Sequence, residues 1–412
     1  MDTRSLTCRI DNLDDEALID FTQRLVRVPS VNQPEAGRSE AAAVEVVVEK
    51  ASEFGWSVDV EEVAPGRPNA IIRIEGGLPG PTLLFEGHTD VVTEGDHNDW
   101  TVDPFGGEII DGKLYGRGSA DMKGGVAAMM FATRALQLGG PFPGTIILAI
   151  LCDEEEMMIG VHDFVDKGHA ARVDGVIVCE PEAGEVCNVH KGAIRLRVDV
   201  VGTMSHGAMP HQGRNPIAAM SRFIEAARQI EAHLQDEFGD HPQLGLVYLT
   251  PTHITAGSLP QLNVIPAPGL CTFDIRTVPG VDHDMLLAEL NAVADALGDE
   301  LEVQFTLEVL VDRAPTDTPA TDPVVVAVAE AHRAVTGEEP VYGGVPGTTD
   351  GTILWRDANL PVVVYGPGGK WIAHQKDEFV TVDELLCASR VYVEAANRFL
   401  GASDDECVRT SI

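Results

Sequence analysis

Two kinds of hydrophobic pattern alternate along the first half of the chain. Apolar residues recur at helical spacing over residues 15–29 and again over 39–54. A longer segment rich in Ala and Met, 121–138, predicts a buried helix. Short apolar runs rich in β-branched residues predict strands at 70–74, 82–86, 145–151 and 175–179. Strands that alternate with helices in this way indicate an α/β sheet covered on both faces.

The pattern changes between residues 194 and 310. A strand, a helix near 216–233, two strands near 245–256 and 269–278, a second helix and a last strand follow one another. The order β-α-β-β-α-β is that of a ferredoxin-like α+β unit.

The pattern of the first part then resumes, with a helix at 323–335 and a strand at 361–366. The chain therefore leaves a main domain and returns to it. A length of 412 residues agrees with this, because it is too long for one ordinary core. The sequence predicts an α/β domain in two parts, 1–193 and 311–412, with an inserted unit at 194–310.

Charge narrows the range of possible partners. The formal net charge of −36 makes a nucleic acid or an anionic membrane an unfavourable partner, because like charges repel. Only seven lysines occur and acids are spread along the whole chain, which predicts a surface adapted to high salt. No apolar run is long enough to span a membrane, and acids interrupt the N-terminal segment where a signal peptide needs an apolar stretch. We therefore predict a halophilic, cytoplasmic protein that binds neither nucleic acid nor membrane.

Acidic residues and histidines follow several of the predicted strands. They are His88, Asp90, Glu154, Glu155 and Glu180, together with Asp121 in a glycine-rich turn and His374 after the glycine-rich segment 366–369. The carboxyl ends of strands form the edge at which α/β sheets bind ligands. So many carboxylates in one place are unfavourable unless cations neutralise them. A lone His-x-Asp pair is most often a surface hydrogen bond, but this position favours a metal site.

Several ordered motifs resemble those of the M20-type metallopeptidases and deacylases, which include acetylornithine deacetylase and succinyl-diaminopimelate desuccinylase. The resemblance extends over nearly the whole chain. The motifs are Gly87-His88-Thr89-Asp90-Val91-Val92, Asp103-Pro104-Phe105-Gly106-Gly107, Gly116-Arg117-Gly118 through Asp121-Met122-Lys123-Gly124, Asp153-Glu154-Glu155, Glu180-Pro181, Asn263-Val264-Ile265-Pro266 and the late His374. Several motifs at family-like spacing are more specific than any one of them.

This resemblance implies an α/β catalytic domain that holds two divalent metal ions and carries an inserted ferredoxin-like lid and dimerisation domain. His88, Asp121 and Glu180 would bind one ion. Asp121, Glu155 and His374 would bind the other, so Asp121 would bridge the two. Zn²⁺ suits histidine and oxygen ligands, and Co²⁺ or Mn²⁺ suits the same geometry. Two divalent cations would offset the three ligand carboxylates and a bridging hydroxide.

The resemblance also implies roles for two acids beside the metals. Asp90 would accept the second ring N–H of His88 and fix the ring for coordination. Glu154 would be the general base that takes a proton from the water between the metals and delivers it to the leaving amine. Without the other motifs, Glu154 would be interpreted as one more surface acid in the run 153–156.

Further residues are implied to contact the substrate. His206, in the inserted unit, matches a family histidine that reaches across a dimer interface to stabilise the oxyanion of the tetrahedral intermediate. Asn263 and Arg276 are implied polar contacts, Arg276 because a guanidinium can bind a carboxylate through two hydrogen bonds. Thr349 lies in a loop where the family usually has Ser, which leaves the preferred acyl group open. A homodimer formed through the inserted unit follows from the same resemblance.

The leading prediction is hydrolysis of an amide bond in a small N-acyl amino acid, of the acetylornithine deacetylase or succinyl-diaminopimelate desuccinylase type. A dipeptidase or carboxypeptidase, and a hydrolase that deprotects an amino acid on a carrier, are alternatives within the family. A non-catalytic metal-dependent binding protein is the alternative of another class, and Glu154 beside all five ligands disfavours it. Phosphate binding is disfavoured because Gly116-Arg117-Gly118 lacks the Lys-Ser/Thr pair of a phosphate loop.

Overall fold

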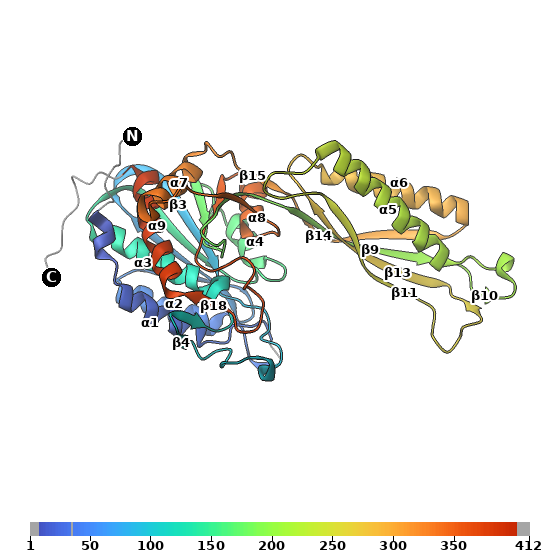
Figure 1. Ribbon diagram of the computed structural model, residues 1–412, viewed down its shortest axis with the longest axis horizontal. Coiled ribbons are helices and arrows are strands. Elements are labelled where there is room, and N and C mark those ends of the chain that lie inside the picture. Colours follow the sequence, from blue (N-terminus) through green and yellow to red (C-terminus); the bar gives the residue numbers. More distant parts are fainter. Residues whose placement is uncertain (1–7, 34–35, 402–412) are drawn as a thin grey trace. The chain divides into compact units, whose positions relative to one another are not determined.

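Two compact units make up the protein. The computed structural model describes residues 8–33 and 36–401, and Figure 1 shows its ribbon. Unit 1 comprises the chain up to Asn188, Thr318–Gly343 and the chain from Thr349 onward. Unit 2 comprises Val189–Asp317 and Gly344–Thr348.

A nine-stranded sheet has most of its residues in unit 1, while β15 and the ends of β8 and β16 belong to the residue ranges of unit 2. Its strands are β1 (Val58–Ala64), β2 (Arg67–Glu75), β3 (Gly77–His88), β6 (Phe142–Leu151), β7 (Gly175–Val178), β8 (Val186–His190), β15 (Thr316–Asp317), β16 (Tyr342–Val345) and β17 (Val362–Val364). Their order is β1-β2-β6-β3-β7-β17-β8-β15, with β16 beside β8. β3 is parallel to β6 and β7, and β17 is parallel to β7. The carboxyl ends of these four strands therefore lie at one edge of the sheet.

Helices cover this sheet. They are α1 (Asp15–Val26), α2 (Ala41–Glu53), α3 (Gly124–Leu138), α4 (Ile159–Asp166), α7 (Pro323–Thr336), α8 (Asp350–Ala358) and α9 (Val382–Leu400). α9 packs against α3 and α7, while α4 packs against α8, and both groups contact the sheet. Every residue of β7 and β17 is buried, as in strands with helices on both faces. The predicted α/β sheet is therefore confirmed.

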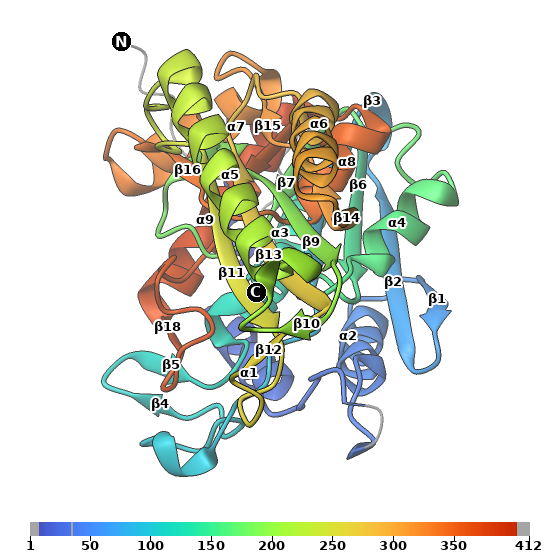
Figure 2. The ribbon, with the colours of Figure 1, turned by 90° about the vertical axis from the view of Figure 1, so that its right-hand side faces the viewer.

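Unit 2 has the predicted order β-α-β-β-α-β. Its main elements are β9 (Gly192–Val201), α5 (Pro216–Phe238), β11 (Tyr248–Ala256), β13 (Pro268–Thr277), α6 (His283–Leu301) and β14 (Gln304–Arg313). The four strands are antiparallel in the order β11-β13-β9-β14, and Figure 2 shows α5 and α6 side by side along this sheet. A separate two-stranded sheet is formed by β10 (Ser205–His206), which follows β9 in the chain, and β12 (Val264–Ile265), which precedes β13. β9 and β14 both extend beyond the predicted limits 194–310.

Some local features differ from the sequence-based expectation. The helix predicted at 121–138 begins at Gly124, because Asp121 and Met122 have non-helical backbone angles. A three-stranded sheet of β4 (Ile109–Ile110), β5 (Lys113–Tyr115) and β18 (Phe379–Thr381) was not predicted, nor was α9 with its capping box between Thr381 and Glu384.

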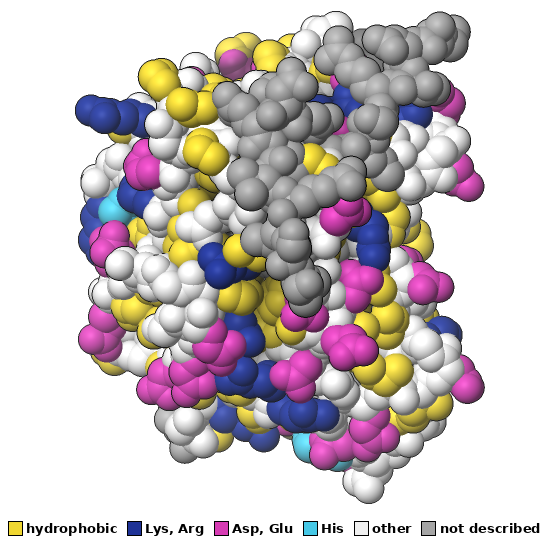
Figure 3. Space-filling view, turned by 90° about the vertical axis from the view of Figure 1, so that its left-hand side faces the viewer, with side chains coloured by type: hydrophobic (Ala, Val, Ile, Leu, Met, Phe, Trp, Pro, Cys, Tyr) yellow, Lys and Arg dark blue, Asp and Glu magenta, His cyan; other side chains and the backbone are white. Residues whose placement is uncertain are grey.

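The helices and one face of the surface can be compared with the predictions about membranes and charge. None of the helices between residues 8 and 401 that the structure describes is both long and apolar enough to cross a membrane. Figure 3 shows one face of the molecule, on which acidic side chains are spread with Lys and Arg side chains between them.

Candidate metal centre

The predicted ligands converge because parallel strands end together. His88 is the last residue of β3, Glu155 follows β6, and Glu180 follows β7. Asp121 comes from η4 (Ser119–Lys123), the turn that precedes α3, and the peptide bond after it is cis. His374 comes from the loop between β17 and β18 and has a positive φ of 64°. All five residues belong to unit 1.

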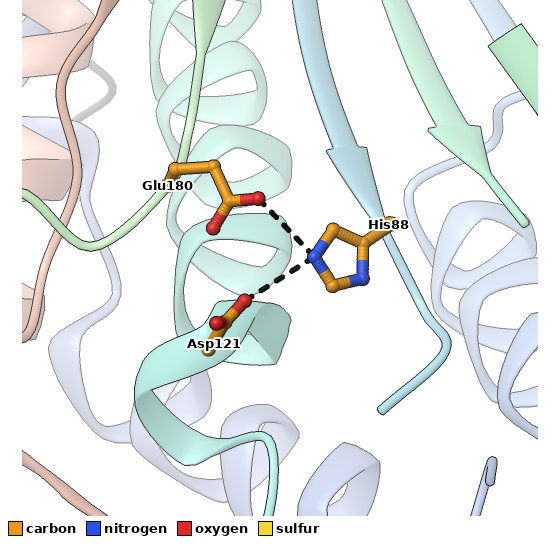
Figure 4. A group of neighbouring side chains, drawn as sticks. All are labelled: His88, Asp121 and Glu180. Carbon is orange, nitrogen blue, oxygen red and sulfur yellow. Dashed lines mark ion pairs between the residues drawn. The ribbon is translucent and has the colours of Figure 1, made fainter. Parts of the chain in front are cut away.

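In the first group of ligands, two carboxylates lie beside the His88 ring. Its Nε2 lies 3.3 Å from Asp121 Oδ1 and 3.2 Å from Glu180 Oε1, and Figure 4 shows both carboxylates directed at this nitrogen. The other ring nitrogen, Nδ1, lies 3.0 Å from the backbone oxygen of Asp90. A carbonyl oxygen only accepts, so Nδ1 carries the hydrogen and the Nε2 of the neutral ring is left free to coordinate a metal.

The second group of ligands meets on the other side of Asp121. His374 Nε2 lies 2.9 Å from Glu155 Oε1 and 3.3 Å from Asp121 Oδ2. The two carboxylate oxygens of Asp121 thus face two different histidines. In each of the two groups, the potential ligand atoms lie within 4.8 Å of one another. This is the geometry of two adjacent sites with one shared carboxylate.

The electrostatics of the centre favour added positive charge. Burial raises the pKa of Glu180 and of Glu154 well above its ordinary value, and repulsion between the clustered carboxylates adds to the rise. Burial opposes protonation of His88, but Asp90 and Glu180 outweigh it and raise the pKa of His88 well above its usual range. The His374 ring N–H can donate to the carboxylates of Asp121 and Glu155, and these hydrogen bonds raise the pKa of His374 to about 10. Bound cations would stabilise the carboxylate forms and displace these protons.

The donor set fits divalent metal ions. His88 Nε2 and Asp121 Oδ1 are buried, and neither has a hydrogen-bond partner among the residues that the structure describes. Buried polar atoms ordinarily have such partners. Two imidazoles with carboxylates match the ligand preferences of Zn²⁺, Co²⁺ and Mn²⁺.

Glu154 stands beside these ligands. Its Oε2 lies 3.9 Å from His88 Nε2, and the residue is only 8% exposed. The preceding Asp153, with φ of 69°, pairs with Arg67 and accepts hydrogen bonds from the backbone N–H groups of Met157 and Ile159. Asp153 thus fixes the turn that directs Glu154 and Glu155 toward the centre.

Asp90 lies behind His88, but its contacts differ from the predicted ones. The His88 ring N–H at Nδ1 donates to the backbone oxygen of Asp90, while the Asp90 carboxylate Oδ1 is 3.4 Å from the same nitrogen. Its Oδ2 accepts the backbone N–H of Glu155 at 3.0 Å. Asp90 therefore contacts ligands of both groups.

The remaining predicted residues lie in both units. In unit 2, His206 pairs with Val264 across the β10–β12 ladder, and Gly207 N–H donates to the backbone oxygen of Asn263 at 2.7 Å. His206 and Asn263 are thus neighbours. Arg276, on β13, pairs with Asp274 at 2.6 Å. Thr349, in unit 1, is buried and caps α8 by accepting the N–H of Gly351.

Two carboxylates that the sequence reasoning did not single out also lie near the centre. Glu86 and Asp350 are buried, and both burial and the neighbouring Asp350 raise the pKa of Glu86 well above its ordinary value. Asp350 also acts electrostatically on Glu154. Their positions in the sequence could have singled them out. Glu86 is two residues before His88 on the same strand face, and Asp350 follows Thr349.

A further acidic cluster lies nearby in the chain but already has a cation. Glu182, Glu185 and Cys187 offer atoms within 4.8 Å of one another. The Lys370 ammonium lies 2.6 Å from Glu182 and 2.7 Å from Glu185. This lysine supplies the positive charge that a metal would supply.

Comparison with known proteins agrees with this geometry. The chain matches the family described as Peptidase family M20/M25/M40 over residues 84–398. It is 34% identical over 403 residues to a succinyl-diaminopimelate desuccinylase of Methylobacterium radiotolerans, covering 94% of this chain and 98% of that protein. It is 35% identical over 396 residues to the protein of the same name from Rhodospirillum centenum, covering 94% and 98%.

Solved structures share the fold. Aminopeptidase PepT from Bacillus cereus has a TM-score of 0.77 at 19% identity, with 94% of this chain and 99% of that chain covered. An M20 family metallo-carboxypeptidase from Sulfolobus solfataricus has a TM-score of 0.73 at 19% identity, with 93% and 98% covered. The chain belongs to the M20/M25/M40 peptidase family.

Membership in this family confirms the predicted resemblance and the predicted enzyme class. The protein is a metal-dependent hydrolase of the kind that acts on amide bonds. A family member from Bacillus subtilis with the same fold is a dinuclear metal-binding peptidase. The metal and the roles of individual residues in this chain are proposals, which follow.

Proposed function

We propose that this enzyme removes the acyl group from a small N-acylated amino acid, with an N-succinyl diamino acid as its preferred substrate. The products are a dicarboxylate and a free amine. The observation that carries the proposal is the buried Glu154 beside two ligand groups that share Asp121. The succinyl preference is supported by the names of relatives that share 34–35% of their residues with this chain.

Two Zn²⁺ ions are the proposed cofactors, held by the five ligands that the sequence predicted. His88 and Glu180 would bind one ion, Glu155 and His374 the other, and Asp121 both. When bound, the metals would polarise the substrate carbonyl and lower the pKa of the attacking water. Co²⁺ or Mn²⁺ would be held by the same side chains.

The protein's own side chains then move the proton. Glu154 would take a proton at its carboxylate and deliver it to the nitrogen of the leaving amine. Its carboxylate can do so because nearby cations favour the ionised form, which burial alone disfavours. Asp90 would hold the His88 ring through its backbone oxygen and hold Glu155 through its carboxylate.

Unit 2 would supply contacts to the substrate and form a homodimer. His206 is exposed, and its Nδ1 accepts the N–H of Ala208 at 3.0 Å. In a neutral ring this leaves Nε2 as a donor, the form needed to stabilise an oxyanion. β11 is an edge strand with a largely exposed surface, and such an edge can pair with a second copy. Asn263 beside His206, and Arg276, would bind polar groups of the substrate.

A substrate screen tests the proposal. Purified enzyme loaded with Zn²⁺ or Co²⁺ would be assayed for released amine against N-succinyl-diaminopimelate, N-acetylornithine, other N-acyl amino acids and dipeptides. We expect the highest kcat/KM for the N-succinyl substrate. A preference for dipeptides would place the enzyme with the peptidases of similar fold. No turnover by metal-loaded enzyme would favour a binding protein. Cytoplasmic location and adaptation to high salt stay predictions.

A further inference from the structure

The two histidines of the candidate metal centre differ in how firmly the fold holds them. His374 is 52% exposed at its side chain and lies in a loop, whereas His88 is fully buried at the end of a strand. A ligand in a loop loses more conformational freedom on metal binding than one on a strand. We therefore looked for a contact that fixes the His374 loop at a set distance from Asp121.

A buried ion pair contacts both segments. Arg117 is 3% exposed and Glu378 is fully buried, and Arg117 Nη1 lies 2.5 Å from Glu378 Oε2. The other oxygen, Glu378 Oε1, accepts the backbone N–H of Ala120 at 3.0 Å and of Asp121 at 3.1 Å. Arg117 Nη2 donates to the backbone oxygen of His374 at 3.3 Å.

We propose that Arg117 and Glu378 are positioning residues that hold Asp121 and His374 together to form the second metal site. The proposal rests on the proposed dinuclear function. Neither residue reaches the ligand side chains; each acts through the backbone of a ligand. The pair therefore sets the distance between two segments that are separated by more than 250 positions in the sequence.

Stability alone is a weak explanation for this pair. Removing two charges from water is unfavourable, and the attraction between them often does no more than offset that penalty. The Arg117 guanidinium also lies 5.3 Å from the centre of the Trp100 ring, which limits its orientation further. An arginine directed at one carboxylate and one ligand carbonyl is suited to fixing geometry, because its donors are held in a plane.

Metal titration of Arg117→Gln and Glu378→Gln tests the proposal. With a competing chelator and Zn²⁺ or Co²⁺ alone as probe, wild type should bind two ions per chain. In each variant we expect one ion to bind as in wild type and the other on the order of 10–100-fold more weakly, which is typical when contacts behind metal ligands are lost. Saturating metal should restore most of kcat.

Arg9→Gln is the matched control. Arg9 is also fully buried, and its guanidinium donates to the backbone oxygens of Leu136, Gly140 and Pro141, none of which is a proposed ligand. This variant removes the same kind of buried group and should lose stability without weakening either metal ion. Equal metal loss in Arg9→Gln and Arg117→Gln would overturn the proposal.

A double-mutant cycle assigns the effect to the second site. His374→Ala removes a ligand, so adding Arg117→Gln to it should weaken metal binding little further. Additive losses would overturn the positioning role, as would unchanged affinity in Arg117→Gln. If that variant does not fold, Arg117→Lys replaces it, since Lys keeps the charge but lacks the planar set of donors. Wild type that binds fewer than two ions would instead contradict the proposed function.

Discussion

Candidate functional residues in the two units differ in what they contact. In unit 1, His88 and Asp121 are directed at each other and at neighbouring carboxylates. In unit 2, Arg276 is paired with Asp274 on its own strand, and His206 is exposed with its ring bonded to its own loop.

This difference separates two kinds of function. Unit 1 contains both groups of candidate metal ligands, and burial, together with the charges of neighbouring carboxylates, raises the pKa of Glu180. In unit 2, Arg276 donates to Asp274 within the unit, and the His206 ring accepts a backbone N–H at Nδ1. Changes in unit 1 should therefore alter metal content or the chemical step, and changes in unit 2 should alter the rate or KM with the metals in place.

Asp121→Ala should have the largest effect. Asp121 faces both histidines, so its loss should deplete both metals, unlike the loss of a ligand to one site. Activity should fall about 10⁴-fold or more, because bound metals supply several kcal/mol of transition-state stabilisation and 1.4 kcal/mol is tenfold. Metal analysis together with kcat/KM measures this. One full equivalent bound with wild-type affinity would show that Asp121 does not bridge.

Glu154→Gln should separate chemistry from metal binding within unit 1. The change removes the proposed base but no ligand, so both ions should stay bound while kcat falls about 10³-fold. Zinc content and rate are measured on the same sample. Glu156→Gln is the control, since Glu156 lies in the same acidic run and is exposed. Full activity in Glu154→Gln would exclude it from the mechanism, and lost metal would make it a ligand.

The sequence predicted the strand-end ligands because sheet topology determines where they lie. Parallel strands end at one edge, so His88, Glu155 and Glu180 could be placed together from hydrophobic runs alone. His374 follows no long strand; its place after the glycine-rich segment 366–369 made it a candidate, and the family resemblance gave it a role as a ligand. The predicted start of α3 was wrong for a local reason. Asp121 has φ of −117° and ψ of 97°, and the spacing of apolar residues does not reveal such non-helical angles.

Contacts that support the ligands could not be predicted. Arg117 and Glu378 are far apart in sequence, and their pairing exists only after the chain has folded. The hydrogen bond between His88 and Asp90 differs from the predicted one because the backbone oxygen of Asp90 competes with its carboxylate for the ring N–H. Residue patterns indicate the positions of side chains but not which backbone atoms they contact. Spacing indicates which residues can meet, but hydrogen-bond partners depend on atomic geometry.

His206→Ala should retain both metals and lower kcat on the order of 10²–10³-fold, the usual effect of losing an oxyanion donor. If His206 acts across a dimer, mixing His206→Ala subunits with Glu154→Gln subunits should restore activity. Each mixed dimer would pair one intact Glu154 with one intact His206, giving about half the activity of a normal dimer. No recovery despite demonstrated subunit exchange, or a fully active monomer, would refute the trans arrangement.

Arg276→Gln should have a smaller effect, confined to substrate binding. A lost hydrogen bond to a charged group is worth about 1.5–3 kcal/mol, so KM for an N-acyl amino acid should rise roughly 10–100-fold with kcat little changed. Arg197→Gln is the matched control, because Arg197 lies on β9 of the same sheet and pairs with Asp199 two residues away, as Arg276 does with Asp274. Equal KM values for the two variants would remove Arg276 from the site.

The smallest expected effect on activity belongs to a residue that acts on the stability of unit 2. His190 is fully buried, with Nδ1 2.6 Å from Thr316 Oγ1, and burial lowers the pKa of His190 to about 3. In the unfolded chain a histidine has a pKa near 6.5. Between these values the unfolded state binds more protons, so the contribution of His190 to stability is complete above about pH 6.5 and is lost as pH falls toward 3.

Urea unfolding of wild type and His190→Gln at pH 7, 6, 5 and 4.5 measures this dependence. The free energy of unfolding of wild type relative to the variant should fall with decreasing pH, with a slope that approaches about 1.4 kcal/mol per pH unit. The variant lacks the group that must become protonated, so its curve should be flatter. His233→Gln is the control, because His233 is exposed on α5 and its loss should leave the wild-type slope. Metal content should be the same in all three proteins. Parallel curves for wild type and His190→Gln would show that His190 is not held neutral by burial.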